Sequence, residues 1–167
     1  MKLFDESFKK MPRNYVYQSL LATLTMTLIL YFVRLMTHAV VVGALGSSTF
    51  VVFAMPHSTT AEPRRLIGGH IVGLLCGIAC YYLFSTGFLG VMCQNIELVY
   101  LFGGALTVGL AIFLMTITNT EHPPAAGIAL GVFINQWSPG IIAFILLFAV
   151  GISIVRKLLL KRLKNLY

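Results

Sequence analysis

The chain has 167 residues, of which 58% are hydrophobic and only 10% carry a charged side chain. Soluble domains carry about 25% charged residues, so the composition excludes an ordinary soluble domain and indicates one membrane domain over residues 1–167. The net charge of +7 would suit nucleic acid, but the basic residues gather at the two ends and in one loop. That distribution is typical of the flanks of membrane spans, and no nucleic-acid partner is expected.

The chain starts with MKLFDESFKKMPRN, a segment that carries both signs of charge and has no apolar core. This pattern is not that of a cleavable signal peptide, and it predicts a short amphipathic lead-in. The three cysteines, Cys76, Cys80 and Cys93, have no partners at the spacing of metal ligands. We therefore expect no metal site and no cofactor.

Six apolar runs follow the lead-in, and they differ in length. A membrane-spanning helix needs about 20 apolar residues, with about 17 as the lower end. The second and fifth runs are short and rich in small or polar residues, so they fit either tight crossings or broken, re-entrant segments. The runs cover roughly residues 16–37, 39–55, 66–86, 98–118, 124–137 and 139–158.

The basic residues favour six crossings. If all six runs cross, eleven of the twelve basic residues lie on the side of the N-terminus, the 56–65 loop and the tail 156–167, and only Arg34 lies near the other side. With four crossings, the two arginines of the 56–65 loop would break the positive-inside rule. The sequence thus predicts a multi-pass protein of the cell (inner) membrane with both termini in the cytoplasm.

The two halves of the chain are similar at an offset of 84 residues. THAVVVGALG (37–46) aligns with EHPPAAGIALG (121–131) with one residue inserted, which pairs His38 with His122. Since each half holds three segments, the second would be inverted in the membrane, as in many secondary transporters. The predicted fold is therefore an all-α polytopic membrane protein of about six transmembrane segments, built as two inverted three-segment repeats (about 15–86 and 98–158).

The segment NTEHPPAAGIALG (119–131) places polar residues between two apolar runs. Proline suits the first turn of a helix, because its missing N–H has no intrahelical partner there. Pro123 and Pro124 therefore predict a helix start. A helix N-terminus attracts anions, and His122 could add a donor whose charge changes near neutral pH. Alternatively, Glu121 and His122 only cap the helix.

The first half has a polar set of its own. The hydroxyls of Ser47, Ser48 and Thr49 could coordinate a small solute or bond back to their own helix. In the next loop we expect Glu62 to pair with Arg64 or Arg65. Gly68, Gly69 and Gly73 predict a close-packing face, and His70 predicts an interhelical hydrogen bond. The residues expected to form a substrate pathway are His38, Gly46, Ser47, Ser48, Thr49, Arg64, His70, Asn119, Glu121, His122, Pro123, Pro124 and Gly127.

Two motifs together resemble the HPP family of integral membrane proteins. AMPHSTTAEPRRLIGGH is followed some fifty residues later by TNTEHPPAAGIAL, and the resemblance covers about residues 17–155. The family's Ala-Gln-Pro-Arg stands here as Ala61-Glu62-Pro63-Arg64, which adds a charge. Members are usually described with four spans, fewer than the six expected here. Some plastid and cyanobacterial members are linked to nitrite transport, so the resemblance implies a small anion as substrate.

The leading hypothesis is a transporter or channel for a small inorganic anion in the lipid bilayer. At 18.4 kDa the chain is small for a complete pathway, so a homo-oligomer is expected. One alternative is an intramembrane enzyme that uses Glu121 and His122. It is disfavoured because no second acid and no Ser-His-Asp set is discernible. The other alternative is an assembly or sensor module without transport of its own.

Overall fold

A computed structural model describes residues 6–33, 39–85, 96–135 and 137–166. The described ranges hold seven α-helices and a short 3-10 helix, without a strand, which confirms the all-α class. The helices are α1 (Glu6–Lys10), α2 (Pro12–Val33), α3 (Ala39–Ala54), η1 (Thr59–Ala61), α4 (Pro63–Ser85), α6 (Ile96–Ile117), α7 (Pro123–Ile134) and α8 (Pro139–Leu159).

Proline marks the start of most of the long helices. Its φ angle is fixed near the helical value and its missing N–H is not needed in the first turn. Ser138 adds a cap to α8, where its Oγ accepts a hydrogen bond from the backbone N–H of Ile141 at 3.3 Å. Four of the six prolines are first helical residues: Pro12, Pro63, Pro123 and Pro139.

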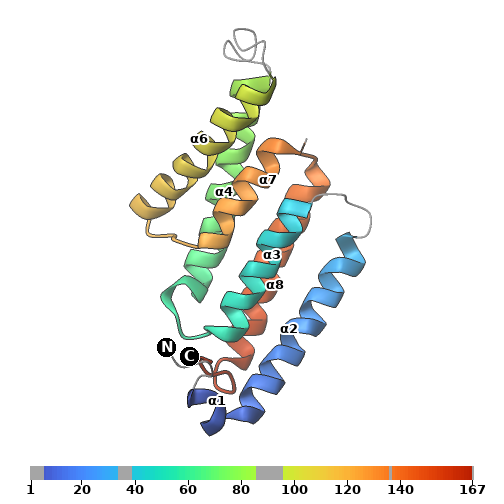
Figure 1. The fold of residues 1–167 in the computed structure, drawn as a ribbon, viewed down its shortest axis with the longest axis vertical. Helices are drawn as coiled ribbons and strands as arrows, with labels where there is room; N and C mark the ends of the chain where they lie inside the picture. The colour runs from blue at the N-terminus through green and yellow to red at the C-terminus, as the bar shows by residue number, and fades with distance from the viewer. Residues whose placement is uncertain (1–5, 34–38, 86–95, 136, 167) are drawn as a thin grey trace.

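The helices α2, α3, α4, α6, α7 and α8 alternate in direction along the chain (Figure 1). The short helices α3 and α7 lie side by side at the centre, with α8 behind α3 and α4 behind α7. Helices α2 and α6 lie on opposite flanks of this pair. Each half thus has a long, a short and a long helix, with 22, 16 and 23 residues in the first half and 22, 12 and 21 in the second. The inverted relationship between the halves stays a prediction.

Fewer of the described helices meet both the length and the hydropathy of a membrane span than the six crossings that the sequence predicted. Within the described residues, two helices are long and apolar enough to cross a membrane, Pro63–Phe84 and Pro139–Leu159. The shorter apolar helices are Ala39–Ala54, Leu101–Ile117 and Pro123–Ile134. At about 1.5 Å per residue, α7 extends only about 18 Å, against a hydrocarbon core of about 30 Å. Helix α7 alone is therefore too short to span the core.

The glycines of α4 let α7 approach its backbone closely. A Cβ atom added to Gly69 would lie 2.7 Å from His122 Cβ, and one added to Gly73 would collide with the carbonyl oxygen of Ala125. One turn further along, a Cβ atom on Gly77 would lie 2.7 Å from Ala129 O. Small residues are what close packing of membrane helices requires. The predicted close-packing face of α4 is confirmed, and it fixes the position at which α7 begins.

The start of α2, the connection between α3 and α4 and the C-terminal tail meet at one end of the bundle. Tyr15 Oη donates to Leu166 O at 2.5 Å, and Gln18 Nε2 donates to Lys164 O at 2.8 Å. The backbone N–H of Leu166 in turn donates to Ala54 O at 2.9 Å. The N-terminal segment, the 56–65 loop and the tail were predicted to lie on the same side of the membrane, and their described residues lie together. The end of the tail packs against α2 and α3.

Candidate functional site

A fully buried polar cluster lies where α3, α4 and the start of α7 meet. It consists of Ser48 from α3, His70 from α4 and His122 just before α7, each with 0% of its surface exposed. Ser48 Oγ lies 3.0 Å from His122 Nε2 and 3.4 Å from His70 Nε2. The two imidazole rings are 5.1 Å apart, centroid to centroid. Three of the residues predicted for the pathway are therefore brought together.

Backbone carbonyls determine where the imidazole protons are. His122 Nδ1 lies 2.9 Å from Thr60 O, and His70 Nδ1 lies 2.7 Å from Leu66 O. A carbonyl oxygen only accepts hydrogen bonds, so each Nδ1 carries a hydrogen. In a neutral imidazole the other nitrogen is then a bare acceptor. Both Nε2 atoms consequently direct lone pairs at Ser48.

The cluster has more acceptors than hydrogens. The Ser48 hydroxyl has a single hydrogen, and besides the two Nε2 atoms it faces Ala44 O at 3.1 Å. At most one of these three acceptors receives it at a time. A buried polar atom left without a partner costs about 1–3 kcal/mol, so the neutral cluster is an incomplete hydrogen-bond network.

His122 lies in the connection between α6 and α7, and its environment disfavours the charged form. Burial lowers the pKa of His122 from 6.5 to about 4, and the hydrogen bond to Thr60 O acts in the opposite direction. The prediction that His122 changes charge near neutral pH is therefore wrong for this structure, because burial removes the water that would solvate the imidazolium.

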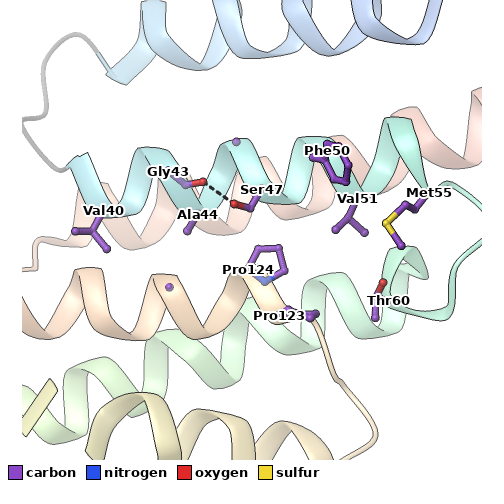
Figure 2. Close-up of a pocket in the computed structure, with 12 residues that line it drawn as sticks. Val40, Gly43, Ala44, Ser47, Phe50, Val51, Met55, Thr60, Pro123 and Pro124 are labelled. Carbon is purple, nitrogen blue, oxygen red and sulfur yellow. Dashed lines mark hydrogen bonds between the residues drawn. The ribbon is translucent and has the colours of Figure 1, made fainter. Parts of the chain in front are cut away.

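A cavity of about 970 Å³ lies beside the cluster, between α3 and the start of α7 (Figure 2). Its wall is largely apolar. The apolar side chains come from α3 and from the residue after it: Val40, Phe50, Val51 and Met55. Thr60 lines the same cavity, and its carbonyl oxygen is the acceptor for His122 Nδ1. Five of the predicted pathway residues line it: Gly46, Ser47, Pro123, Pro124 and Gly127.

The start of α7 offers fewer hydrogen-bond donors than a free helix N-terminus. Pro123 and Pro124 have no N–H, and the N–H of Ala125 donates to His122 O at 2.8 Å. The helix start that was predicted to attract an anion therefore presents no unpaired N–H group from Pro123 to Ala125. What remains for an anion is the positive end of the helix dipole.

Ser47, Ser48 and Thr49 all bond back to their own helix. Ser47 Oγ donates to Gly43 O at 3.0 Å, as Figure 2 shows, and Thr49 Oγ1 donates to Leu45 O at 2.9 Å. This is the commoner of the two roles predicted for them. Of the three, Ser48 also contacts the side chains of His70 and His122, so its contacts differ from those of its two neighbours.

Arg65 connects the start of α4 to the connection between α6 and α7. Its Nη1 lies 2.5 Å from Glu121 Oε2, and its Nη2 donates to Asn119 Oδ1 at 2.8 Å. Glu62 Oε2 lies 3.9 Å from Arg65 Nε, which confirms the predicted pairing of Glu62 with one arginine. Asn119 has a φ of 57°, a left-handed conformation that asparagine tolerates. Glu121 and Asn119 thus hold the segment before His122 in place.

A second cavity of about 300 Å³ lies on the α6 side of the same segment. Glu121, His122 and Pro123 line it together with Thr116 and other residues of α6. Arg64 is exposed, and its Nη2 lies 3.4 Å from Thr118 O. His38, the remaining predicted pathway residue, lies outside the described residues.

Three residues at this end were missed as site components. Thr60 acts through its backbone carbonyl, so its side chain gave no signal. Arg65 was assigned only to topology. Arg156 was placed in the basic tail, but it is buried and its Nε donates to Pro56 O at 2.8 Å. Among the described residues, no three His, Cys, Asp or Glu side chains gather closely enough to hold a metal ion.

Comparison with known proteins places the chain among membrane proteins. A transmembrane protein of Dictyostelium discoideum is 33% identical over 93 residues, which cover 54% of this chain and 29% of that relative. A second one from the same organism is 33% identical over 90 residues, covering 53% of this chain and 25% of the relative. This chain therefore spans less than a third of either relative, and no solved structure matches it. Residues 8–165, nearly the whole chain, match the family described as HPP, transmembrane region, and the chain belongs to that family.

Proposed function

We propose that this chain forms a pathway for a small inorganic anion across a lipid bilayer, with nitrite as a candidate substrate. The observation that carries the proposal is the cavity of about 970 Å³ between α3 and the start of α7. Short helices with Pro or Gly interruptions form the substrate sites of many transporters. Here Thr60 and Pro123 in the cavity wall connect directly to the buried His122, Thr60 through its carbonyl oxygen and Pro123 as the next residue in the chain.

The charges around the cavity favour an anion over a cation. None of the residues that line it within the described part of the chain is acidic. The nearby Glu121 is paired with Arg65. The positive end of the α7 dipole lies at Pro123, the first residue of the helix, which lines the cavity. Such a dipole stabilises an anion by about 0.3–1 kcal/mol when exposed and up to about 2 kcal/mol when partly buried. Binding is therefore weak, which suits an anion that must also be released.

A second copy of the chain would complete the wall of this pathway. Phe50 lines the cavity and is 61% exposed, so one copy leaves the cavity open beside it. Exposed apolar patches of this kind are covered by lipid or by a partner. A homo-oligomer built on the α3–α7 face would enclose the cavity.

We assign the end of the bundle that holds the start of α2 and the C-terminal tail to the cytoplasm. Arg64, Arg65 and the basic residues of the tail lie at this end, together with the start of α2. Cytoplasmic segments of membrane proteins carry the excess of Lys and Arg. The part of the cavity wall that Thr60 and Pro123 form then lies toward the cytoplasmic side.

Uptake into proteoliposomes tests the proposal, with nitrite, nitrate, chloride and formate offered separately. We expect uptake of at least one anion above that of protein-free vesicles, which also corrects for the leak of nitrous acid. Gly43→Leu should reduce this uptake at least tenfold, because Gly43 lines the cavity and a Cβ atom there meets nothing within 4 Å. Gly109→Leu is the matched control, since it adds the same side chain at an equally open site on α6.

Two results would contradict an anion pathway in this cavity. The first is uptake of none of the four anions by protein that runs as a single species on size exclusion. The second is equal uptake by Gly43→Leu and Gly109→Leu.

An intramembrane hydrolase is a second candidate, because one distance favours it. Ser48 Oγ and His122 Nε2 are 3.0 Å apart, the arrangement of a serine nucleophile and its base. Against it, Ser48 has no exposed surface and its Oγ also contacts Ala44 O and His70. Covalent labelling of Ser48 by a fluorophosphonate probe, absent in Ser48→Ala, would support the hydrolase over the anion pathway.

A further inference from the structure

We propose that Ser48, His70 and His122 together bind one proton, which crosses the membrane with the anion. The inference rests on the proposed anion pathway and names its coupling ion. It starts from the incomplete hydrogen-bond network, in which two bare Nε2 atoms face a single hydroxyl.

One added proton completes the network. The proton binds to one Nε2 atom, which then donates to Ser48 Oγ, and the Ser48 hydroxyl donates to the other Nε2 atom. Both Nδ1–H groups keep their bonds to Thr60 O and Leu66 O. The shared hydroxyl also allows the proton to pass from one imidazole to the other. A second proton would place two positive charges in rings whose centroids are 5.1 Å apart, and like charges at such a distance oppose it.

The protein supplies no counter-charge for this proton. Among the described residues, neither imidazole has a carboxylate in contact: Glu121 and Glu62 both pair with Arg65. From α8, the side chain that faces His70 is the ring of Phe148, at 6.2 Å between centroids. Arg156 of the same helix donates to Pro56 O, and α3 and η1 contribute only Ser48 and the Thr60 carbonyl to the imidazoles. A buried charge without a partner is unstable.

An anion in the neighbouring cavity supplies the missing charge. Ser47 and Thr60 line that cavity, and each is directly linked to the cluster, Ser47 as the chain neighbour of Ser48 and Thr60 through His122 Nδ1. Anion and proton then favour each other's binding, and this coupling is reciprocal. The empty site stays neutral and the loaded site carries no net charge, so one monovalent anion moves with one proton.

Flux driven by defined gradients tests the coupling in proteoliposomes to which nitrite is added from outside. We expect an inward proton gradient to accelerate nitrite uptake at least tenfold over protein-free vesicles, and a potassium diffusion potential set with valinomycin to leave it unchanged. Uptake that follows the voltage and ignores the proton gradient would overturn the coupling while leaving the anion pathway intact. Absence of all anion uptake would overturn both.

Histidine variants locate the proton. His70→Gln should reduce the acceleration by the proton gradient, because glutamine cannot take up the proton and only His122 is left to bind it. His57→Gln, which changes a histidine outside the cluster that contacts Leu163 O, should respond like the unchanged protein. Equal acceleration of His70→Gln and His57→Gln would overturn the assignment.

A spectroscopic measurement on the unchanged protein covers the case in which His70→Gln does not fold. With ¹⁵N-labelled histidine, both cluster imidazoles should show the neutral Nδ1–H form at pH 7. Saturating nitrite should convert the equivalent of one imidazole per chain to the protonated form. Signals that stay neutral in saturating nitrite would contradict a shared proton site.

Discussion

Ser48 and His122 are 74 residues apart in the chain, and Ser48 Oγ lies 3.0 Å from His122 Nε2. The contact joins the two short helices of the structure, α3 and α7, at the level where α7 begins. Because His122 is the residue before Pro123, this contact and the Thr60 carbonyl together fix where the helix starts. The short helices are therefore linked by polar contacts as well as by packing of small residues.

Ser48→Ala should destabilise the protein, whereas Ser47→Ala should not. Removing the Ser48 hydroxyl removes the single hydrogen that the two buried Nε2 atoms share, and a buried acceptor left without a donor costs about 1–3 kcal/mol. Ser47 is exposed and bonds only back to Gly43 O. The midpoint of thermal unfolding in detergent, followed by size exclusion, measures the difference. Equal midpoints for the two variants would mean that the Ser48 contacts contribute nothing to stability.

Gly73→Ala should weaken the packing of α7 on α4. The added Cβ atom collides with Ala125 O, a backbone atom that moves only if α7 shifts. Overpacking of this kind costs about 1–3 kcal/mol, and it should also displace His122. Gly109→Ala is the control, because its added Cβ atom meets nothing within 4 Å. A drop in the unfolding midpoint as small as that of the control would contradict the close approach of the two helices.

Exchanging the two charges of the Arg65–Glu121 pair should preserve much of the stability and anion uptake, whereas reversing one charge alone should not. Glu121→Arg alone places two positive groups together and should lower both stability and anion uptake, since it loosens the segment before His122. Combining it with Arg65→Glu should restore much of the loss, because the pair is only partly buried and can re-form in the opposite sense. Uptake per folded molecule in the four variants of this cycle is the measurement. No recovery in the double variant would indicate that Glu121 has a direct role in the pathway.

The sequence predicted the helical class and the close-packing glycines because both depend on residue type and spacing. The proline pair also located one helix start correctly, that of α7 at Pro123. The six crossings stay a prediction, because the length of an apolar run does not determine where its helix begins and ends. In the 124–137 run, the helix α7 ends at Ile134.

The site was predicted only in part, because it depends on contacts between distant segments. His122, His70 and Ser48 were each singled out, but their convergence on one hydroxyl requires α3, α4 and α7 to pack as they do. The charge of His122 was predicted from its residue type, whereas burial decides it. Thr60 contributes a carbonyl oxygen that every residue type has, so no sequence pattern could have identified it.

Cysteine labelling should place the end that holds the start of α2 and the C-terminal tail in the cytoplasm. In a background without Cys76, Cys80 and Cys93, Thr59→Cys lies exposed in the connection between α3 and α4, and Gly140→Cys lies exposed at the start of α8, at the other end of the bundle. A membrane-impermeant maleimide should label Gly140→Cys in intact cells and Thr59→Cys only after the cells are opened. The reverse pattern would invert the orientation, and labelling of both from outside would contradict a crossing between them.

Stability should fall as the pH is lowered from about 6.5 to about 4. His122 has its pKa lowered from 6.5 to about 4 in the folded protein, mainly by burial. In this window the unfolded chain binds a proton at His122 and the folded protein does not, so the free energy of unfolding decreases with decreasing pH. Above pH 6.5 His122 is neutral in both the folded and the unfolded chain, so its contribution to the free energy of unfolding no longer changes with pH. At about 1.36 kcal/mol per pKa unit, the loss at the acid end is on the order of 3 kcal/mol.

His122→Gln should make this pH dependence less steep, and His57→Gln, at an exposed residue near the tail, is the control. Unfolding midpoints measured from pH 7.5 to pH 4.5 in one detergent separate the two. Saturating nitrite should also flatten the dependence in the unchanged protein, since an anion beside the cluster stabilises the imidazolium and raises the folded-state pKa. A midpoint of the unchanged protein that is constant over this range would contradict a buried, neutral His122. If the unfolding midpoint changes with pH equally with and without nitrite, nitrite does not bind close enough to His122 to change its pKa.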